Sequence, residues 1–348
     1  MKLLIVHPGA STSTSDVADG LCFGLEHHGV ELVRYRLDQR IERSRRWLMH
    51  NWNRTKRRNP SIERPTIADI FYQAGTDALA MALRHQVDCV LVVSAMFLHP
   101  DVIILMKRAG LRVVVLFTES PYDQEKELAV AKLVDGCWTS ERTSVDAFAA
   151  VNPRAGYLAH AWHPERHASR LAEGDEGVPA HDVVFVGTGF HDRIGWLEAI
   201  DWTGIDLGLY GNWQNLGPRH PLRQHVRDGV VNNATAAALY RRARIGLNLY
   251  RMAVGAESLN PRAYELARCG AFHLSTFRAE VPETFGDLVP TCSQPQEASA
   301  LIRRWLADPE GRARVQQQLP ACVAESSWVQ RSTRVIGDLQ TLLQQRAA

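Results

Sequence analysis

No apolar stretch of this 348-residue chain approaches the roughly 20 residues that a membrane-spanning helix needs. The N-terminus, Met1-Lys-Leu-Leu-Ile-Val-His-Pro8, is too short to be a signal peptide and is typical of a first buried strand. The six cysteines are scattered without a Cys-x-x-Cys pair, which favours buried, reduced thiols over disulfides or zinc ligands. These absences predict a cytoplasmic protein.

The sequence also lacks internal repeats, low-complexity segments and an Asp-x-Asp motif at a strand end. We therefore expect no cofactor and no divalent metal. His160, His163 and His167 have no further cluster of ligands near them in the sequence, so a metal site there is not favoured. Gly187-Thr-Gly189 lacks the third glycine and the later acid of a dinucleotide-binding fingerprint.

Charge is low overall but unevenly distributed. Nine Lys or Arg and two Glu lie between Arg40 and Arg64, a net +7, which leaves −5 for the rest of a chain whose total is +2. Trp47 and Trp52 lie among these arginines, a pattern suited to phosphate contact with base stacking or to an anionic membrane surface. A plain solvated basic helix remains the alternative.

Short apolar runs alternate with amphipathic helical stretches along the chain. Strands are expected at 2–6, 30–35, 89–93, 111–117, 136–139 and 156–159, and after an apolar-poor linker at 170–180 a second series begins at Asp182. This βαβ alternation predicts parallel, doubly wound sheets. We expect an α/β protein of two Rossmann-like domains facing a central cleft, with residues 1–165 and 166–325, and a final helix at 326–348 packing on the first domain.

The most informative stretch runs from Glu257 to Glu265 and on to Phe272. Asn260 can cap a helix whose first position suits Pro261, and Gly270 fits the left-handed residue after its end. A helix N-terminus after a strand favours anions, whereas two carboxylates favour hydroxyl groups. A nucleotide sugar carries both kinds of group.

These motifs resemble the glycosyltransferases of the spore-maturation-protein (CgeB-like) group, relatives of the retaining group 1 glycosyltransferases with the GT-B fold. The matching stretches are Phe185-Val-Gly-Thr-Gly-Phe-His-Asp-Arg193, Leu209-Tyr-Gly-Asn-Trp213, Leu239–Asn248, Ser258-Leu-Asn-Pro-Arg-Ala-Tyr-Glu265, Ala267–Phe272 and Ser327–Arg334, with Phe117–Asp123 and Asp135–Ser140 in the first half. The basic segment 40–64 has no counterpart in the resemblance.

The resemblance implies transfer of a hexose from a nucleotide-diphosphate sugar, with a UDP-sugar ranked first, to an acceptor hydroxyl with retention. It gives Glu265 the ribose hydroxyls, Glu257 the sugar and the charge at its anomeric carbon, and the amides of Ser258, Leu259 and Asn260 the diphosphate. Arg193 would face the diphosphate; no lysine follows it closely, so Arg251 or Arg262 would assist. The further donor-side candidates are Gly9, Gly187, Gly189, Tyr210, Asn212, Trp213 and Asn248, the Tyr210–Trp213 group facing the base.

An inverting reaction would instead need a protein base, for which His99, Glu119 and Asp123 are candidates because each follows an apolar run. Glu119 and Glu127 have the same spacing as Glu257 and Glu265, but we interpret them as a pair on a solvated helix. The acceptor is expected to be anionic, with hydroxymethylated DNA, a lipid or a polysaccharide as options, held by basic and aromatic residues of the first domain. These are Arg43, Arg45, Arg46, Trp47, Trp52, Arg57 and Arg58.

Two other functions stay open at this point. A nucleotide-sugar 2-epimerase shares the fold and needs no acceptor, and a non-catalytic module could bind the sugar nucleotide without reaction, because a fold alone does not fix function. The oligomeric state is also open.

Overall fold

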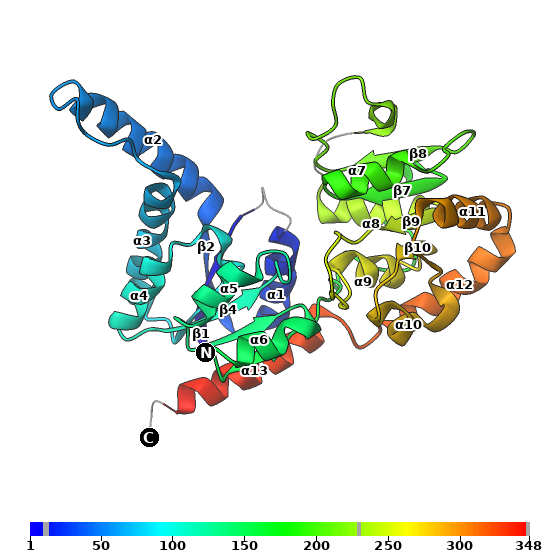
Figure 1. Cartoon of the computed structure of the whole chain (residues 1–348). Coiled ribbons are helices and arrows are strands. Elements are labelled where there is room, and N and C mark those ends of the chain that lie inside the picture. Colours follow the sequence, from blue (N-terminus) through cyan, green and yellow to red (C-terminus); the bar gives the residue numbers. More distant parts are fainter. Residues whose placement is uncertain (10–13, 228–230, 346–348) are drawn as a thin grey trace. The chain divides into compact units, whose positions relative to one another are not determined.

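A computed structural model describes residues 1–9, 14–227 and 231–345, which form two compact units (Figure 1). Unit 1 comprises Met1–Ala159 with Val329–Ala348, and unit 2 comprises His160–Trp328. The division thus follows Ala159 rather than residue 165. Among the described residues, no helix combines the length and the apolar composition that a membrane span requires.

Unit 1 is built on a six-stranded parallel sheet in the order β2-β1-β3-β4-β5-β6. The strands are β1 (Lys2–His7), β2 (Glu31–Arg36), β3 (Cys89–Val93), β4 (Arg112–Phe117), β5 (Gly136–Thr139) and β6 (Ala155–Tyr157). Its helices are α1 (Ser15–His27), α2 (Leu37–Lys56), α3 (Ile67–His85), α4 (Pro100–Arg108), α5 (Gln124–Ala131), α6 (Val145–Ala149) and α13 (Trp328–Gln344), with short 3-10 turns at Ala95–Phe97 and Arg142–Ser144. Every residue of β3 is buried, as the unbroken apolar run of that strand predicts for a central parallel strand.

Unit 2 repeats this plan with five parallel strands in the order β11-β10-β9-β7-β8. The strands are β7 (Val183–Val186), β8 (Leu207–Tyr210), β9 (Ile245–Asn248), β10 (His273–Thr276) and β11 (Thr291–Cys292). The helices are α7 (His191–Glu198), α8 (Asn233–Arg242), α9 (Pro261–Arg268), α10 (Glu280–Phe285), α11 (Pro295–Leu306) and α12 (Pro309–Cys322), with 3-10 turns at Asp175–Gly177, Pro221–His225 and Gly286–Leu288.

The last helix, α13, returns to unit 1 and is held there by side-chain contacts. Trp138 Nε1 on β5 donates to Asp338 Oδ2 at 2.8 Å, and Ser332 Oγ donates to the carbonyl of Leu21 at 3.5 Å. The segment that precedes the helix pairs with the start of unit 2, because Trp162 N–H donates to the Ser326 carbonyl at 3.1 Å.

The expected linker at 170–180 is docked onto unit 2. Arg241 of α8 binds both carboxylate oxygens of Asp175, and its Nη1 donates to the Arg166 carbonyl at 3.1 Å. A segment with little apolar periodicity is therefore fixed by one buried ion pair, which its composition does not reveal.

Candidate functional site

The candidate site in unit 2 begins where the sheet reverses its strand order. From β7 the chain continues to β8 on one side, and β9 then pairs with β7 on the other, with Val183 opposite Ile245. In open parallel sheets, ligands bind beyond the carboxyl ends of the strands at such a switch point. The loops that follow β7 and β9 carry the glycine pair and the stretch that leads to Glu257.

Arg193 joins these two loops. Its Nη1 donates to the carbonyl of Thr188, after β7, and its Nε donates to the carbonyl of Leu249, after β9, both at 3.1 Å. The guanidinium of Arg193, the candidate for the diphosphate, thus lies at the switch point and is held there by two backbone oxygens.

Three arginines gather around two phenyl rings at this edge. The Cζ atoms of Arg193 and Arg251 lie 5.1 and 4.9 Å from the ring centroid of Phe190, and that of Arg262 lies 4.6 Å from the ring of Phe185. Stacking on a ring fixes the plane of a guanidinium and leaves its in-plane N–H groups able to form hydrogen bonds. These three arginines supply positive charge at this edge, where no lysine closely follows Arg193 in the sequence.

The helix α9 begins as its sequence predicts. Asn260 Oδ1 accepts from the Ala263 N–H at 3.0 Å, and Gly270 follows the helix with φ of 63°. The cap is also tied to the sheet, because Asn260 Nδ2 donates at 2.8 Å to Oδ1 of the fully buried Asn248 at the end of β9. Arg262 Nη1 donates to the same oxygen at 3.3 Å, so strand end, cap and cation form one network.

The glycine pair allows close approach, here by the chain's own side chains. A Cβ on Gly187 would lie 2.4 Å from Arg262 Nη2, and one on Gly189 would lie 2.4 Å from Trp213 Cε3. Both values are well inside van der Waals contact, so neither position accepts a side chain without displacing its neighbour.

The two predicted carboxylates occupy different environments. Glu265 lies on α9 with 8% of its surface exposed. Burial raises the pKa of the Tyr240 hydroxyl, and the nearby charge of Glu265 raises it further. Glu257 lies half-buried in the loop between β9 and α9, and its carbonyl accepts from the Glu280 N–H at 3.2 Å.

The backbone amide of Leu259 is already used in this structure. It donates to Glu280 Oε2 at 2.5 Å, whereas the resemblance gives this amide to the diphosphate. Sequence reasoning missed Glu280, the first residue of α10, and Arg278, which lies in the short connection between β10 and that helix.

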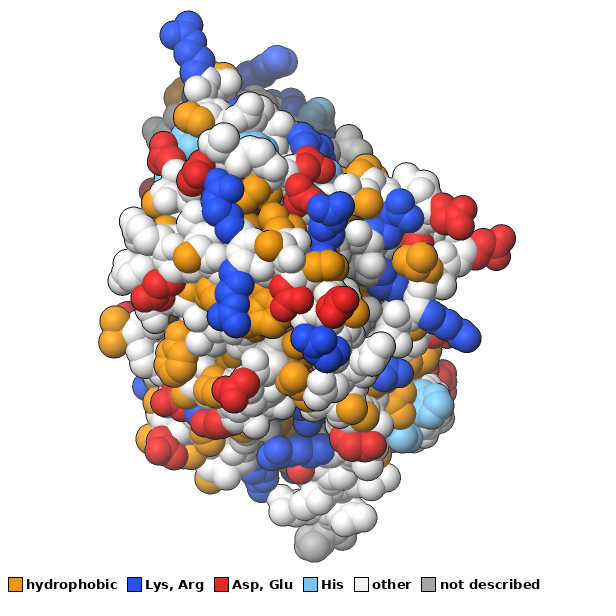
Figure 2. Space-filling model, turned by 90° about the vertical axis from the view of Figure 1, so that its right-hand side faces the viewer, with side chains coloured by type: hydrophobic (Ala, Val, Ile, Leu, Met, Phe, Trp, Pro, Cys, Tyr) orange, Lys and Arg blue, Asp and Glu red, His pale blue; other side chains and the backbone are white. Residues whose placement is uncertain are grey.

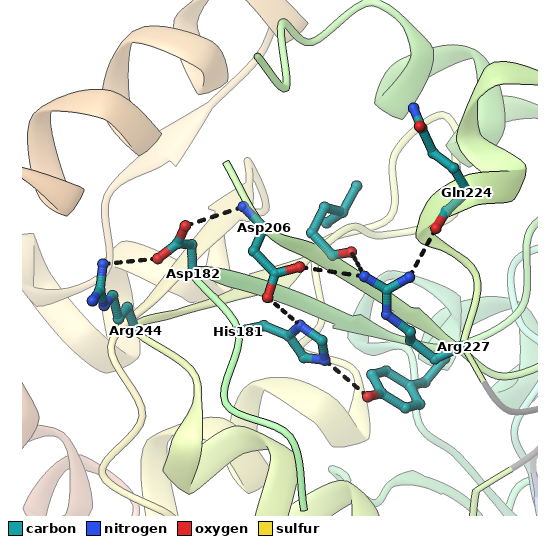
Figure 3. A network of polar contacts seen from close by, with 8 residues as sticks. His181, Asp182, Asp206, Gln224, Arg227 and Arg244 are labelled. Carbon is teal, nitrogen blue, oxygen red and sulfur yellow. Dashed lines mark hydrogen bonds and ion pairs between the residues drawn. The ribbon is translucent and has the colours of Figure 1, made fainter. Parts of the chain in front are cut away.

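Tyr210 and Trp213, which the resemblance places at the nucleobase, are both buried in this structure. Tyr210 is 4% exposed, and its hydroxyl lies 2.8 Å from His181 Nε2, whose Nδ1 lies 2.8 Å from Asp206 Oδ2 (Figure 3). Trp213 is 3% exposed and packs edge-on against Phe185. Both rings are core residues here because neighbouring side chains cover them. Asn212 is exposed, and its Oδ1 accepts from the Gln214 N–H at 3.1 Å.

The three candidate bases in unit 1 follow strands but have structural partners. His99 caps α4, with Nδ1 accepting from the Asp101 N–H at 3.2 Å, which is the simple capping role. Asp123 pairs with Lys126 at 3.0 Å. Glu119 is half-buried just after β4. Gly9, after β1, has φ of 103° and closely approaches Asp38.

The interpretation of Glu119 and Glu127 as a pair on a solvated helix is wrong. Glu119 lies in the loop before α5, and Glu127 is buried on that helix with 8% exposed. The Glu127 carboxylate accepts from the Glu119 N–H at 3.0 Å and from the Ser120 hydroxyl. Burial raises the pKa of Glu127 to about 7.

The basic segment forms a helical arm. We call residues 37–64, which comprise α2 and the loop after it, the basic arm; α2 packs along α3 and projects from unit 1 (Figure 1). Trp47 is 57% exposed, whereas Trp52 is partly buried, with Lys56 Nζ 4.7 Å and Arg64 Cζ 6.0 Å from its ring centroid. Of the predicted acceptor residues, Arg45 and Arg46 pair with Glu42, while Arg43, Arg57 and Arg58 are exposed.

The surface in Figure 2 contrasts with this arm, because cationic and anionic side chains are interspersed over it. The histidines give no metal site in the described residues: His167 Nδ1 accepts from the His163 N–H at 2.9 Å, and no group of three His, Cys, Asp or Glu in that part of the chain could share an ion. The six cysteines are free and five of them are buried.

Residues 193–337 match the sequence model of a family described as glycosyl transferase-like. The chain therefore carries a glycosyl transferase-like domain, which covers most of unit 2 and the start of α13. No curated protein matches the sequence significantly.

Solved structures share the fold over almost the whole chain. A trehalose-6-phosphate structure from E. coli, bound with UDP-2-fluoro glucose, matches with a TM-score of 0.62 at 11% identity, covering 97% of this chain and 99% of that one. The trehalose 6-phosphate synthase of Burkholderia multivorans matches with the same score and identity over 100% of both chains. The N-terminal domain of a Candida albicans trehalose-6-phosphate phosphatase also scores 0.62 at 11% identity, over 98% and 97%. At this identity the likeness concerns the fold, and the predicted GT-B fold is confirmed.

Proposed function

We propose that this protein is a glycosyltransferase of the CgeB-like group that moves a hexose from a nucleotide-diphosphate sugar to an acceptor hydroxyl. The observation that carries the proposal is the arginine cluster of Arg193, Arg251 and Arg262 at the switch point, next to the capped start of α9. Positive charge and a helix N-terminus at one sheet edge suit a diphosphate.

The reaction asks these groups to stabilise a departing diphosphate. The bond between the anomeric carbon and the phosphate oxygen breaks, the acceptor oxygen bonds to the anomeric carbon, and the acceptor proton passes to the departing phosphate oxygen. Guanidinium groups held in advance neutralise the charge that develops on that oxygen. We propose that they do so without a divalent ion.

The carboxylates divide the rest of the donor between them in this proposal. Glu265, buried on α9, accepts from the ribose hydroxyls, and Glu257 accepts from the sugar hydroxyls and stabilises positive charge at the anomeric carbon. We propose the amides of Ser258 and Asn260 for the diphosphate; that of Leu259 donates to Glu280 in this structure.

A UDP-hexose and a retaining outcome are the first versions to test. The E. coli structure with this fold is bound with UDP-2-fluoro glucose, and a trehalose-6-phosphate synthase with this fold is described as transferring a glycosyl group with retention. Both statements concern those proteins and guide the choice of probes here.

For the acceptor, we propose an anionic molecule that binds to the basic arm. Arg43, Arg57 and Arg58 are exposed there, and so is the ring of Trp47. Guanidinium groups recognise phosphates and carboxylates, and an indole can stack on a base. Hydroxymethylated DNA is one candidate, and an anionic lipid or polysaccharide is another.

The deciding experiment is a thermal-shift screen with UDP-, GDP-, ADP- and TDP-sugars, followed by calorimetric titration of the best ligand. A donor present at 100 times its Kd should stabilise the protein by about 2.7 kcal/mol through mass action. If none of these nucleotide sugars raises the Tm, the proposed function is rejected.

A further inference from the structure

The loop that carries Glu257 depends on another segment for its shape. Residues 249–260 connect β9 to α9 without a helix or strand of their own. Backbone groups in such a loop need partners outside it, because an unpaired polar group away from water is costly. Arg278, in the connection between β10 and α10, and Glu280, the first residue of α10, supply several of them.

Arg278 holds the first part of this loop. Its Nη2 donates to the Arg251 carbonyl at 2.7 Å, and its Nη1 donates to the carbonyls of Ala256 at 2.6 Å and Ala253 at 3.4 Å. The side chain is 8% exposed and its Cζ lies 5.0 Å from the ring centroid of Tyr250. One buried guanidinium thus orders three carbonyls, the last of them directly before Glu257.

Glu280 holds the second part. Its backbone N–H donates to the Glu257 carbonyl at 3.2 Å, and its Oε2 accepts from the Leu259 N–H at 2.5 Å. Hydrogen bonds therefore hold the backbone at Ala256, at Glu257 itself and at Leu259. The segment that contains Arg278 and Glu280 is itself held to the sheet, since the Phe277 N–H donates to the Cys292 carbonyl at 3.3 Å.

We propose that Arg278 and Glu280 are positioning residues that hold the Glu257 carboxylate in place for the sugar of the donor. The Arg278 guanidinium donates to three carbonyls from two separate nitrogens in one rigid plane, a geometry that the single nitrogen of a lysine ammonium does not reproduce. A misplacement of about 1 Å at a reacting group can lower turnover about 100-fold. The assignment of Glu257 to the sugar rests on the proposed function, whereas the bracing of the loop does not.

The first test needs no ligand and uses hydrogen exchange in Arg278→Lys, Glu280→Ala and the wild-type protein. Peptides covering residues 251–260 should exchange at least tenfold faster in both variants, while peptides from unit 1 stay unchanged. Arg314→Lys, an exposed arginine of α12, is the matched control and should leave the loop unaffected. Unchanged exchange in the 251–260 peptides of the variants overturns the proposal.

The second test separates positioning from general damage, with UDP and UDP-glucose as probes. Arg278→Lys and Glu280→Ala should lower the turnover of UDP-glucose hydrolysis at least tenfold and weaken the Kd for UDP by a clearly smaller factor, because UDP lacks the sugar and keeps its proposed contacts with Arg193 and Glu265. Glu280→Gln should recover most of the turnover, since its amide oxygen can accept from the Leu259 N–H. Equal losses of UDP binding and turnover, or full turnover in the variants, overturn the positioning role. A wild-type protein that binds no nucleotide rejects the proposed function, and hydrogen exchange then still decides whether the loop is braced.

Discussion

Asp175 and Arg241 form a buried, bidentate ion pair in unit 2. The distances are 2.6 Å between Arg241 Nε and Asp175 Oδ2 and 2.9 Å between Nη2 and Oδ1, and the two side chains are 6% and 5% exposed. Hydrogen bonds from Arg241 lower the pKa of Asp175. The pair makes the acid-rich segment after Arg170 part of the folded unit.

Removing one partner of this pair should therefore destabilise unit 2. We expect Arg241→Met to lower the free energy of unfolding by about 3–5 kcal/mol, because Asp175 is left charged and buried. The measurement is urea unfolding followed by tryptophan fluorescence. The exposed pair of Arg303 and Asp201 offers a matched control, since Arg303→Met should cost less than about 1 kcal/mol. Similar losses in the two variants would show that burial adds nothing here.

Replacing Glu265 and replacing Glu257 should have different effects on donor binding and on turnover. Glu265→Gln should weaken binding of UDP roughly tenfold by removing one charge-assisted hydrogen bond to the ribose. Glu257→Gln should leave UDP binding unchanged and lower turnover of UDP-glucose roughly 100-fold, because its interaction develops at the anomeric carbon. Calorimetry and a UDP-release assay measure the two effects. Glu310→Gln, an exposed change on α12, serves as the control, and an exchange of the two phenotypes would reverse the assigned roles.

Glu127 should make stability depend on pH. Its folded-state pKa of about 7 exceeds the usual 4.5 because it is buried, so the unfolded chain ionises first as pH rises. The stability of the wild-type protein relative to Glu127→Gln should accordingly fall between about pH 4.5 and 7, by on the order of 3 kcal/mol. Unfolding titrations at pH 5, 6, 7 and 8 measure this difference. Glu125→Gln, an exposed change on the same helix, is the matched control; a pH-independent difference for Glu127→Gln would mean that the carboxyl is not protonated in the folded protein.

Neutralising the basic arm should weaken binding of an anionic acceptor. The triple variant Arg43→Gln, Arg57→Gln and Arg58→Gln should bind hydroxymethylated DNA less tightly, with a salt slope smaller by about one for each phosphate that no longer has a guanidinium partner. Fluorescence anisotropy against salt concentration measures both quantities, and vesicles of anionic phospholipid replace the DNA in a parallel series.

The control for the arm carries the same change in charge elsewhere. The triple variant Arg303→Gln, Arg304→Gln and Arg314→Gln changes three exposed residues of unit 2 and should leave binding of the anionic acceptor unaltered. If both triple variants lose affinity equally, net charge explains binding and the arm is not a specific surface.

The glycine at position 187 should be intolerant of a side chain. In Gly187→Ala the new Cβ would meet Arg262 Nη2 at 2.4 Å, so the arginine must move and the affinity for UDP should fall at least tenfold. Gly195→Ala is the matched control, because a Cβ there meets nothing within 4 Å and alanine favours the helix by up to about 1 kcal/mol. Unaltered affinity in Gly187→Ala would remove Arg262 from the donor site.

The sequence alone determined the parallel α/β architecture and the start of α9. Apolar runs such as that of β3 place strands because a central parallel strand is buried on both faces. Asn260, Pro261 and Gly270 mark the helix because each residue type satisfies a local backbone requirement. Thr66 and Asp69 form a capping box, a pattern that also predicts the start of α3. That helix was not among the elements expected from the sequence.

Tertiary structure decided which polar residues meet. Arg193 reaches Thr188 and Leu249 because β7 and β9 are neighbours in the sheet although 58 residues separate Val186 from Ile245 within the chain. Glu127 and Tyr210 look exposed or ligand-facing in sequence but are covered by neighbours. Local patterns fix backbone conformation because its hydrogen bonds span a few residues, whereas burial, pKa and long-range partners depend on chain segments that only the packed sheet brings together.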